Sequence, residues 1–160
     1  MYVSVVITCH NEGAYIKQSV NSVITQSDYK HINEIFVVDD GSTDSSPQIL
    51  TQLKLNCDKL KIITTKALGI SAARNVAIKS STSDFIAFLD GDDYWTKNKL
   101  QNQLKAFENN SSIGLIYGDF WDFEKSDASD AIFVPVRSLN NLHINQLVEY
   151  FIYDAPIIPS

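Results

Sequence analysis

Short apolar runs alternate with segments of helical periodicity along most of the chain. The runs are rich in β-branched and aromatic residues and have the length of buried strands; they cover residues 3–8, 35–38, 60–64 and 85–89. Between and after them, apolar residues recur three and four positions apart, which predicts helices after residue 11 and over 46–55, 69–79 and 97–108. This alternation indicates an α/β domain with a mostly parallel sheet and helices on both faces.

Local signals predict where helices begin and how the pattern continues. Asn11 is a candidate N-cap, with Glu12 in the first turn of the helix that follows. Ser46 followed by Pro47 is typical of an N-cap and a first-turn proline. Later in the chain the pattern weakens, and it predicts strands over 113–117 and 131–134 and a helix over 144–152.

Polar and acidic residues directly follow three of the predicted strands, over 8–12, 39–42 and 90–93. In open parallel sheets, ligands bind beyond the carboxyl ends of the strands, so these residues are expected to edge one cleft. The last group holds Asp90, Asp92 and Asp93, whose negative charges repel and raise each other's pKa. That repulsion has to be offset by solvent or by a cation.

Two interpretations of the acidic segment are open. A solvated turn that caps the next helix needs one aspartate, not three, and Gly91 indicates a tight backbone path. A divalent cation, Mn²⁺ or Mg²⁺, is typically held by one or two carboxylates together with the phosphate oxygens of a substrate. The segment therefore favours a metal-assisted site for a phosphate-bearing ligand.

Two further positions have both a structural and a functional interpretation. Asp39 and Asp40 open an Asp-Gly-Ser turn, which is ordinary by itself, but a carboxylate at a strand end can also accept hydrogen bonds from a base or a ribose. Arg74 lies near the start of its predicted helix, where a positive charge opposes the helix dipole. It therefore reaches a partner, either a carboxylate of the protein or a carbonyl or phosphate of a ligand.

Composition narrows the class of protein. The chain has 160 residues and a formal net charge of −6, and its basic residues are scattered, which argues against a nucleic-acid partner. No apolar run approaches the roughly 18 residues of a transmembrane helix. Neither a P-loop nor a Gly-x-Gly-x-x-Gly turn is present. Cys9 in a strand and Cys57 in a polar connection are interpreted as free, reduced thiols, Cys9 packed and Cys57 at the surface, which predicts a cytoplasmic protein.

Five segments in order, between Val3 and about Leu104, resemble family 2 glycosyltransferases with the GT-A fold. As they stand in this chain, they are Val-Ile-Thr-Cys-His-Asn-Glu, Ser-Val-Ile-Thr-Gln, Phe-Val-Val-Asp-Asp-Gly-Ser-Thr-Asp, Gly-Ile-Ser-Ala-Ala-Arg-Asn and Phe-Leu-Asp-Gly-Asp-Asp, at residues 6–12, 22–26, 36–44, 69–75 and 88–93. Each segment alone is a weak signal, and their order and spacing make the resemblance specific.

The resemblance implies a Rossmann-like sheet of GT-A type and inverting transfer of a sugar from a nucleotide-sugar, UDP-sugar above all, with Mn²⁺ or Mg²⁺. The acceptor would be a saccharide or a lipid-linked hydroxyl, as in cell-wall or polysaccharide biosynthesis, at a cytoplasmic site peripheral to the inner face of the membrane. Residues 1–160 would form one domain, its N-terminal donor-binding part. The apolar segment 151–160 indicates that more protein covers it, so the acceptor part is expected beyond Ser160. The resemblance implies a general base well beyond the metal motif, so the base is expected there too, and the chain alone is expected to be inactive.

The resemblance also implies roles for individual residues on the nucleoside side. Thr8, His10 and Glu12 would line the nucleoside pocket. Asp40 would hydrogen-bond the base, and Asp39 would support the turn. Position 10 usually holds tyrosine in this family, so the smaller imidazole is expected to stack less strongly on the base.

On the diphosphate side, the resemblance gives Arg74 to the base or the diphosphate. Asp90 would contact the ribose or the metal, Asp92 would be the main metal ligand, and Asp93 would be structural. Trp95 and Trp121 are large enough to stack on a sugar ring, although packing is the expected role of each.

Two alternatives from other classes are open. A signalling receiver domain would use paired acids such as Asp39 and Asp40, with Asp90 as the phosphorylated residue. Against it, a strand and helix precede the acid pair, and the lysine that such a domain requires at the end of a later strand is not visible. The second alternative is a nucleotide-sugar-binding module of the same fold without catalysis.

Overall fold

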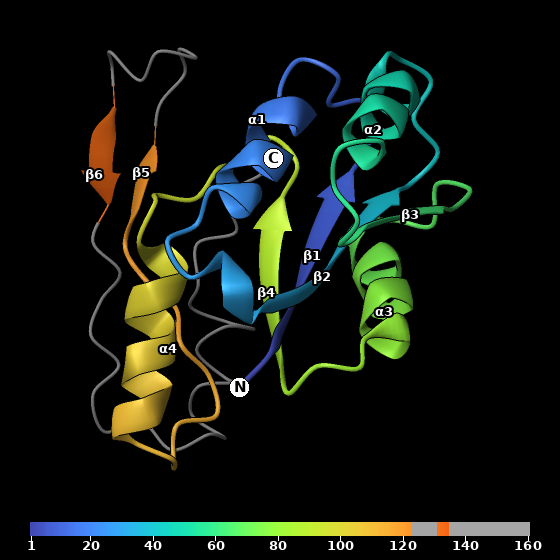
Figure 1. Ribbon diagram of the computed structural model, residues 1–160. Helices are drawn as coiled ribbons and strands as arrows, with labels where there is room; N and C mark the ends of the chain where they lie inside the picture. The colour runs from blue at the N-terminus through green and yellow to red at the C-terminus, as the bar shows by residue number, and fades with distance from the viewer. Residues whose placement is uncertain (123–130, 135–160) are drawn as a thin grey trace. The chain divides into compact units, whose positions relative to one another are not determined.

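The computed structural model describes residues 1–122 and 131–134, and the chain divides into two compact units, Met1–Ile113 and Gly114–Ser160. The first unit is built on a parallel four-stranded sheet of order β3-β2-β1-β4 (Figure 1). Its strands are β1 (Val3–Cys9), β2 (Ile32–Asp39), β3 (Leu60–Thr64) and β4 (Phe85–Asp90). In the second unit, β5 (Phe120–Asp122) and β6 (Ile132–Val134) form an antiparallel pair.

Helices cover both faces of the sheet. They are α1 (Ile16–Ile24), α2 (Ser46–Lys54), α3 (Ile70–Ser80) and α4 (Lys99–Asn109), with a short 3₁₀ turn η1 (Tyr29–His31) before β2. Apolar residues of α1, α2 and α4 pack in one cluster with one face of the sheet. The small residues Ala73 and Ala77 of α3 pack against Val6, Phe36 and Val38 on the other face. This confirms the predicted parallel sheet with helices on both sides.

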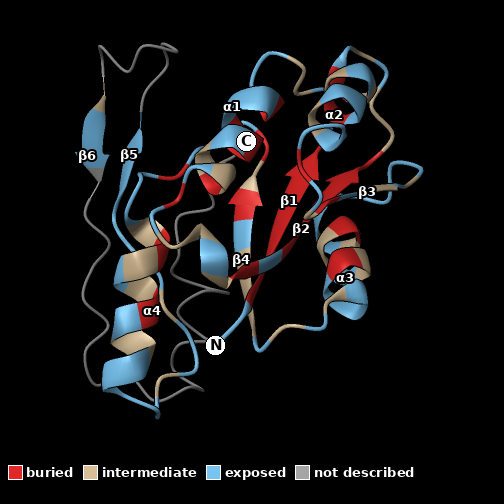
Figure 2. Cartoon of the chain, viewed as in Figure 1, coloured by how far each residue is buried: buried red, intermediate tan, exposed pale blue. Residues whose placement is uncertain are grey.

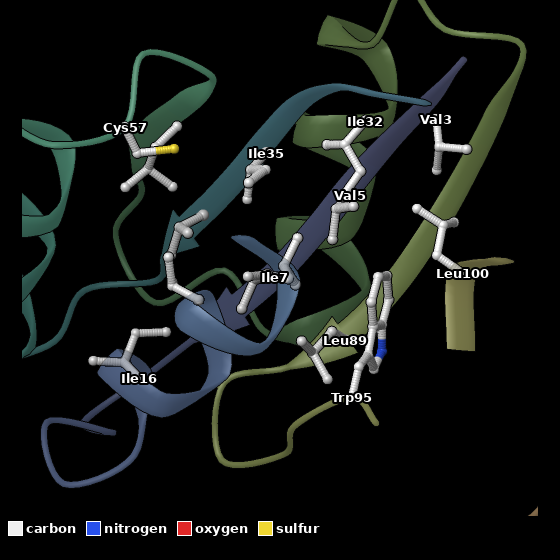
Figure 3. Packing of buried hydrophobic residues seen from close by; sticks show 14 of the residues in the cluster. Val3, Val5, Ile7, Ile16, Ile32, Ile35, Cys57, Leu89, Trp95 and Leu100 are labelled. Carbon is white, nitrogen blue, oxygen red and sulfur yellow. The ribbon is translucent and has the colours of Figure 1, made fainter. Parts of the chain in front are cut away.

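The centre of the sheet is the most deeply buried part of the first unit (Figure 2). Every residue of β1 is buried, because β1 has a strand on each side and a helical layer over each face. Val5 and Ile7 point into the larger core cluster, where Ile16, Leu89 and Trp95 also lie (Figure 3). Trp95 is thus a core residue, as expected from packing, and it anchors the segment that follows β4.

Two predicted helix caps are wrong. Asn11 does not cap α1, because the chain makes a turn first and α1 begins only at Ile16. Glu12 is likewise outside the first helical turn. The N-cap position of α2 is Ser45, one residue before the predicted one. Its first turn is instead capped by Asp44, whose Oδ1 accepts a hydrogen bond from the Ser46 N–H at 2.9 Å.

Differences from prediction concentrate near the boundary of the second unit. The predicted strand over 113–117 is absent, and the strand β5 begins three residues later at Phe120. Leu115 is 59% exposed, and among the described residues no strand pairs with this stretch to complete a ladder. The strand predicted over 131–134 is confirmed as β6. The helix predicted over 144–152 lies outside the described residues.

The surface position predicted for Cys57 is also wrong. Both cysteines are free, as expected, but Cys57 is 5% exposed and belongs to the larger core cluster. Its Sγ lies 3.5 Å from the Tyr29 hydroxyl, under the turn that leads into β2. In the part of the chain that the structure describes, no helix has the length and apolarity to cross a membrane.

Candidate functional site

Strand register brings the predicted site residues to one edge of the sheet. Thr8 on β1 lies opposite Asp90 on β4, and Cys9 lies opposite Asp39 on β2. Since the strands are parallel, the segments that leave them, 10–13, 40–44 and 91–94, all emerge at the same carboxyl edge. The polar residues identified in the sequence therefore do belong to neighbouring segments.

Asp90 is held by one hydroxyl and one guanidinium. Its Oδ1 accepts hydrogen bonds from Thr8 Oγ1 at 3.1 Å and from an Arg74 NH₂ group at 2.6 Å. The Arg74 guanidinium also lies over the Phe88 ring, 5.7 Å from its centroid. Of the two kinds of partner predicted for Arg74, the structure shows a carboxylate of the protein, and contact with a ligand stays a prediction. The side chains of Arg74 and Asp90 are 34% and 39% exposed, so a ligand at this edge of the sheet can reach them.

The acidic turn after β4 has the tight backbone path that Gly91 indicated. The Asp93 N–H donates to the Asp90 carbonyl at 3.1 Å, which closes the turn. A Cβ at position 91 would overlap Glu12 Oε2 and would lie 2.7 Å from the Thr8 carbonyl oxygen, so only glycine fits there. Asp92 is exposed at the outside of this turn. Among the described residues, none donates a hydrogen bond to its carboxylate.

Glu12 lies beneath the acidic turn. Its main-chain oxygen accepts from the Tyr15 and Ile16 N–H groups at 2.9 Å each, while its carboxyl group packs under Gly91. Oε2 is buried and has no hydrogen-bond partner within the described part of the chain. Burial, and then the negative charge of Asp92, raises the pKa of Glu12 from 4.5 to about 7. The nucleoside-pocket role implied for Glu12 stays a prediction; its observed neighbours are the acids of the turn.

Asp39 and Asp40 have different hydrogen-bond partners at the end of β2. Asp39 Oδ1 accepts the Ser42 N–H at 3.0 Å and so supports the turn, in which Gly41 has φ 77°. The Asp40 carboxylate is 6% exposed and accepts from Thr65 Oγ1 at 2.5 Å and from the Leu68 and Gly69 N–H groups at 2.7 Å each. Burial alone would raise the pKa of Asp40, but these three hydrogen bonds hold it below its usual value.

The hydrogen bonds of Asp40 were not foreseen from the sequence. They tie the end of β2 to the segment 65–69 and leave the carboxylate with little acceptor capacity in this conformation. Contact with a nucleobase stays a prediction for Asp40. The signal that could have found the second role is Gly69, whose φ of 88° places its N–H toward the strand end just before α3 begins.

His10 and Asn11 link the ends of β1 and β2. The His10 ring is exposed, and its Nδ1 lies 2.7 Å from the Asp40 carbonyl oxygen. Asn11 adopts a left-handed backbone conformation with φ 61°. Its N–H donates to Ser42 Oγ at 2.9 Å, and its Oδ1 accepts the Thr43 N–H at 2.8 Å. Asn11 therefore joins the loop after β1 to the loop after β2. Because its side chain makes this contact, it does not cap α1.

The donor set fits a hard divalent cation that shares its coordination with a ligand. Among the described residues, no group of three or more His, Cys, Asp or Glu side chains is placed to enclose a metal. One exposed carboxylate, Asp92, and one half-exposed carboxylate, Asp90, stand beside the buried, unpartnered oxygen of Glu12. This excess of negative charge and the small number of ligands match an ion held chiefly between carboxylate and phosphate oxygens.

A hollow of about 840 Å³ opens elsewhere, along the outer side of α1 and the segment 94–97. It is lined by Ala14, Lys17, Gln18, Asn21, Ser22, Thr25, Tyr94, Trp95, Thr96 and Lys97. None of the residues predicted for the nucleotide-sugar site lines it. The candidate site is therefore the open carboxyl edge itself and not this hollow.

Comparison with known proteins places the chain among glycosyltransferases. The chain is 33% identical over 141 residues to the UDP-Glc:alpha-D-GlcNAc-diphosphoundecaprenol beta-1,3-glucosyltransferase WfaP of Escherichia coli, covering 86% of this chain and 53% of that protein. It resembles the crystal structure of S. aureus TarS 1-349 in complex with UDP-GlcNAc with a TM-score of 0.63 and 28% identity, over 74% of this chain and 38% of that one.

A third similarity concerns the fold alone. The mannosyltransferase PcManGT from Pyrobaculum calidifontis, solved with GDP-Man and Mn²⁺, gives a TM-score of 0.62 at 22% identity, over 73% of this chain and 34% of that one. The curated relatives are longer proteins, and the chain spans between 16% and 53% of their lengths.

The model of Glycosyl transferase family 2 matches residues 4–153, which is nearly the whole chain. This match and the solved neighbours confirm the predicted GT-A type of fold and exclude the receiver-domain alternative. The chain belongs to glycosyl transferase family 2.

Proposed function

We propose that the chain is the donor-binding part of an inverting, metal-dependent glycosyltransferase that uses a UDP-sugar. The observation that carries the proposal is the convergence at one edge of the Arg74–Asp90 pair and the exposed Asp92. WfaP is named for UDP-Glc, and TarS was solved with UDP-GlcNAc, which supports uridine as the base. The lipid-linked diphosphate in the name of WfaP supports a saccharide or lipid-linked acceptor.

In this proposal, the chain binds and orients the donor. Asp39 and Asn11 hold the turn at the end of β2, where the nucleoside would lie against His10. Arg74 would direct positive charge toward the diphosphate while its hydrogen bond holds Asp90 in place. Asp92 and Asp90 would hold the cation, which when bound neutralises charge on the diphosphate leaving group.

Transfer with inversion also needs a base that takes the proton from the acceptor hydroxyl as its oxygen attacks the anomeric carbon. We assign no described residue to this role. The proposal for residues 1–160 is accordingly donor and metal binding, with acceptor activation by another part of the protein.

Calorimetric titration of the protein with UDP, with and without Mn²⁺, tests the proposal. We expect Mn²⁺ to tighten UDP binding at least about tenfold, or about 1.4 kcal/mol. Asp92→Ala should abolish this gain and leave the thermal unfolding curve unchanged, because the side chain is exposed. Asp84→Ala removes an exposed acid from the opposite end of the sheet and should keep the Mn²⁺ effect. Metal-independent binding by the unaltered protein would refute the proposal.

A further inference from the structure

A polar stripe runs along α1 and its C-terminal turn, on the side that faces the segment after β4. Ser19, Ser22 and Gln26 are three and four residues apart, so they share one side of the helix. Ser19 is completely buried and Gln26 is 4% exposed, although both are polar. The sequence pattern that contains Ser22 and Gln26 belongs to the segments that resemble the family, but the nucleotide-sugar site gives it no role.

Each member of the stripe hydrogen-bonds to the backbone of the segment 90–100. Ser19 Oγ donates to the Asp90 carbonyl oxygen at 3.3 Å, and Ser22 Oγ accepts the Trp95 N–H at 3.0 Å. The Gln26 amide donates to the Thr96 carbonyl oxygen at 2.8 Å and accepts the Leu100 N–H at 3.0 Å. The stripe therefore contacts the end of β4, the irregular segment 91–98 and the start of α4.

The stripe is also connected along its own length. Ser22 Oγ donates to the Ser19 carbonyl oxygen at 2.7 Å, and Gln26 Nε2 donates to the Ser22 carbonyl oxygen at 3.0 Å. Gln26 therefore uses its amide nitrogen twice and its oxygen once. Its bond to Leu100 satisfies one of the N–H groups at the start of α4, where Asn98 provides no side-chain cap. Buried polar groups satisfied in this way specify one arrangement of the segments they join.

The hydrogen bonds to the Asp90 carbonyl oxygen and from the Trp95 N–H hold the backbone on both sides of Asp92. Only residues 91–94 lie between the two anchored positions, and Gly91 is pressed against Glu12 from below. The Asp92 carboxylate itself is exposed and accepts no hydrogen bond from the described residues, so the backbone sets its position.

We infer that Ser19, Ser22 and Gln26 are positioning residues, which fix the acidic turn so that Asp92 meets the cation together with the diphosphate. This inference rests on the proposed function for its link to the metal. Its structural part, that the stripe holds residues 91–98 in place, stands on the hydrogen bonds alone.

The test compares Ser22→Ala with three variants. Ser22→Ala removes the acceptor of the Trp95 N–H, and Ser22→Thr keeps the hydroxyl. Thr25→Ala removes an exposed hydroxyl at the C-terminal end of α1 that donates to the Asn21 carbonyl oxygen. Ser4→Ala removes a buried hydroxyl at the opposite end of the sheet, and it controls for loss of stability without an effect on the acidic turn.

Two quantities are measured on each variant. Amide hydrogen exchange of the ligand-free protein should be about tenfold faster over residues 91–98 in Ser22→Ala and unchanged there in the other three. The Mn²⁺-dependent affinity for UDP should fall about fivefold in Ser22→Ala, while the affinity without Mn²⁺ stays constant. If Ser22→Ala does not fold, Ser19→Ala takes its place in the test. It removes the hydrogen bond from the Ser19 hydroxyl to the Asp90 carbonyl oxygen, and the same changes in exchange and affinity are expected to be smaller.

The outcomes separate the two proposals. Unchanged exchange over residues 91–98 would overturn the positioning role, whatever the nucleotide result. Faster exchange with an unchanged Mn²⁺ effect would reduce the stripe to a link between α1 and α4 and would also overturn it. Loss of the Mn²⁺ effect from the unaltered protein would instead refute the proposed function, and the exchange result would still decide whether the stripe holds the turn.

Discussion

Glu34 and Glu12 are both glutamates beside the central strand β1, but they lie at opposite ends of the sheet and have opposite surroundings. Glu34 on β2 is 3% exposed and lies opposite Ser4. Its carboxylate accepts from Ser4 Oγ and the Thr82 N–H, both at 2.9 Å, and forms an ion pair with Lys61. Burial opposes ionisation, but the hydrogen bonds from Lys61, Thr82 and Ser4 outweigh it and lower the pKa of Glu34 to about 2.

Glu12 receives no such compensation. Among the described residues, one of its buried oxygens has no hydrogen-bond partner, and the charges of Asp92, Asp90 and Asp44 add to burial in raising its pKa. Glu34, which serves the fold, is thus saturated with donors, whereas within the described residues Glu12 keeps one buried oxygen without a donor and the Asp92 carboxylate accepts no hydrogen bond. The difference agrees with the proposal that the ligand binds at the carboxyl edge, and it does not depend on any motif.

The largest loss of stability is expected from removing the Glu34 carboxylate. Glu34→Ala removes the charged acceptor of the Ser4 hydroxyl and of the Thr82 N–H and should lower the free energy of unfolding by about 3 kcal/mol at pH 7. Lys61 contributes little of this, because its side chain is half exposed. Urea denaturation measures the loss.

The loss of stability in Glu34→Ala should depend on pH. Because folding lowers the pKa of Glu34, its stabilisation is complete above about pH 4.5 and is lost as the pH falls toward 2, so the two denaturation midpoints should converge there. Asp84→Ala, an exposed acid at the same end, should shift the free energy by no more than about 0.5 kcal/mol. A pH-independent difference would show that Glu34 is not ionised in the folded protein.

Asp40 is an exception to the comparison, because it lies at the carboxyl edge but is saturated like Glu34. Asp40→Asn turns one acceptor oxygen into a donor that faces either the Gly69 N–H or the Thr65 and Leu68 donors, and it should lower the free energy of unfolding by about 2 kcal/mol. Denaturation in the absence of nucleotide measures this. Full stability with weakened UDP binding would mean that Asp40 belongs with the ligand-binding acids after all.

The smallest effect, and the one of opposite sign, is expected for Glu12→Gln. Folding raises the pKa of Glu12, so the folded protein binds more protons between about pH 4.5 and 7, and its free energy of unfolding falls as the pH rises through that window. Removing the charge should therefore stabilise the metal-free protein by about 1 kcal/mol at pH 8, after allowance for solvent screening, and by nothing at pH 4. Denaturation in EDTA measures both values.

Glu108→Gln is the matched control for Glu12→Gln, since Glu108 is an exposed glutamate on α4. It should leave the stability unchanged at both pH values. Destabilisation by Glu12→Gln at pH 8 would contradict the uncompensated charge that distinguishes the carboxyl edge.

The sheet and its covering helices were predictable because local pattern and burial agree there. The apolar run of β1 is buried along its whole length, and the helical spacing of Ile16, Val20 and Val23 matches the buried side of α1. The stretch 113–117 is equally apolar, but a strand needs a neighbour for its backbone, and the sequence does not say whether one is present.

The edge of the site was predictable in position but not in contacts. Parallel strands carry the residues that follow them to one edge, which is why Asp40 and Asp90 come out where they were expected. Their partners come from distant segments: Gly69 N–H reaches Asp40, and the Glu12 carboxyl group lies under Gly91. Such approaches depend on how loops cross after folding, and no local spacing encodes them.

The central place of β1 has a consequence for how the chain assembles during synthesis. β1 lies opposite β2 from Val3–Ile32 onward, but its other neighbour begins only at Phe85. A nascent chain can build β1, β2 and β3 while the far side of β1 still shows unpaired peptide groups, which is the condition that invites pairing with other chains. Because the acidic turn directly follows β4, it forms only when β4 pairs with β1 and closes that gap.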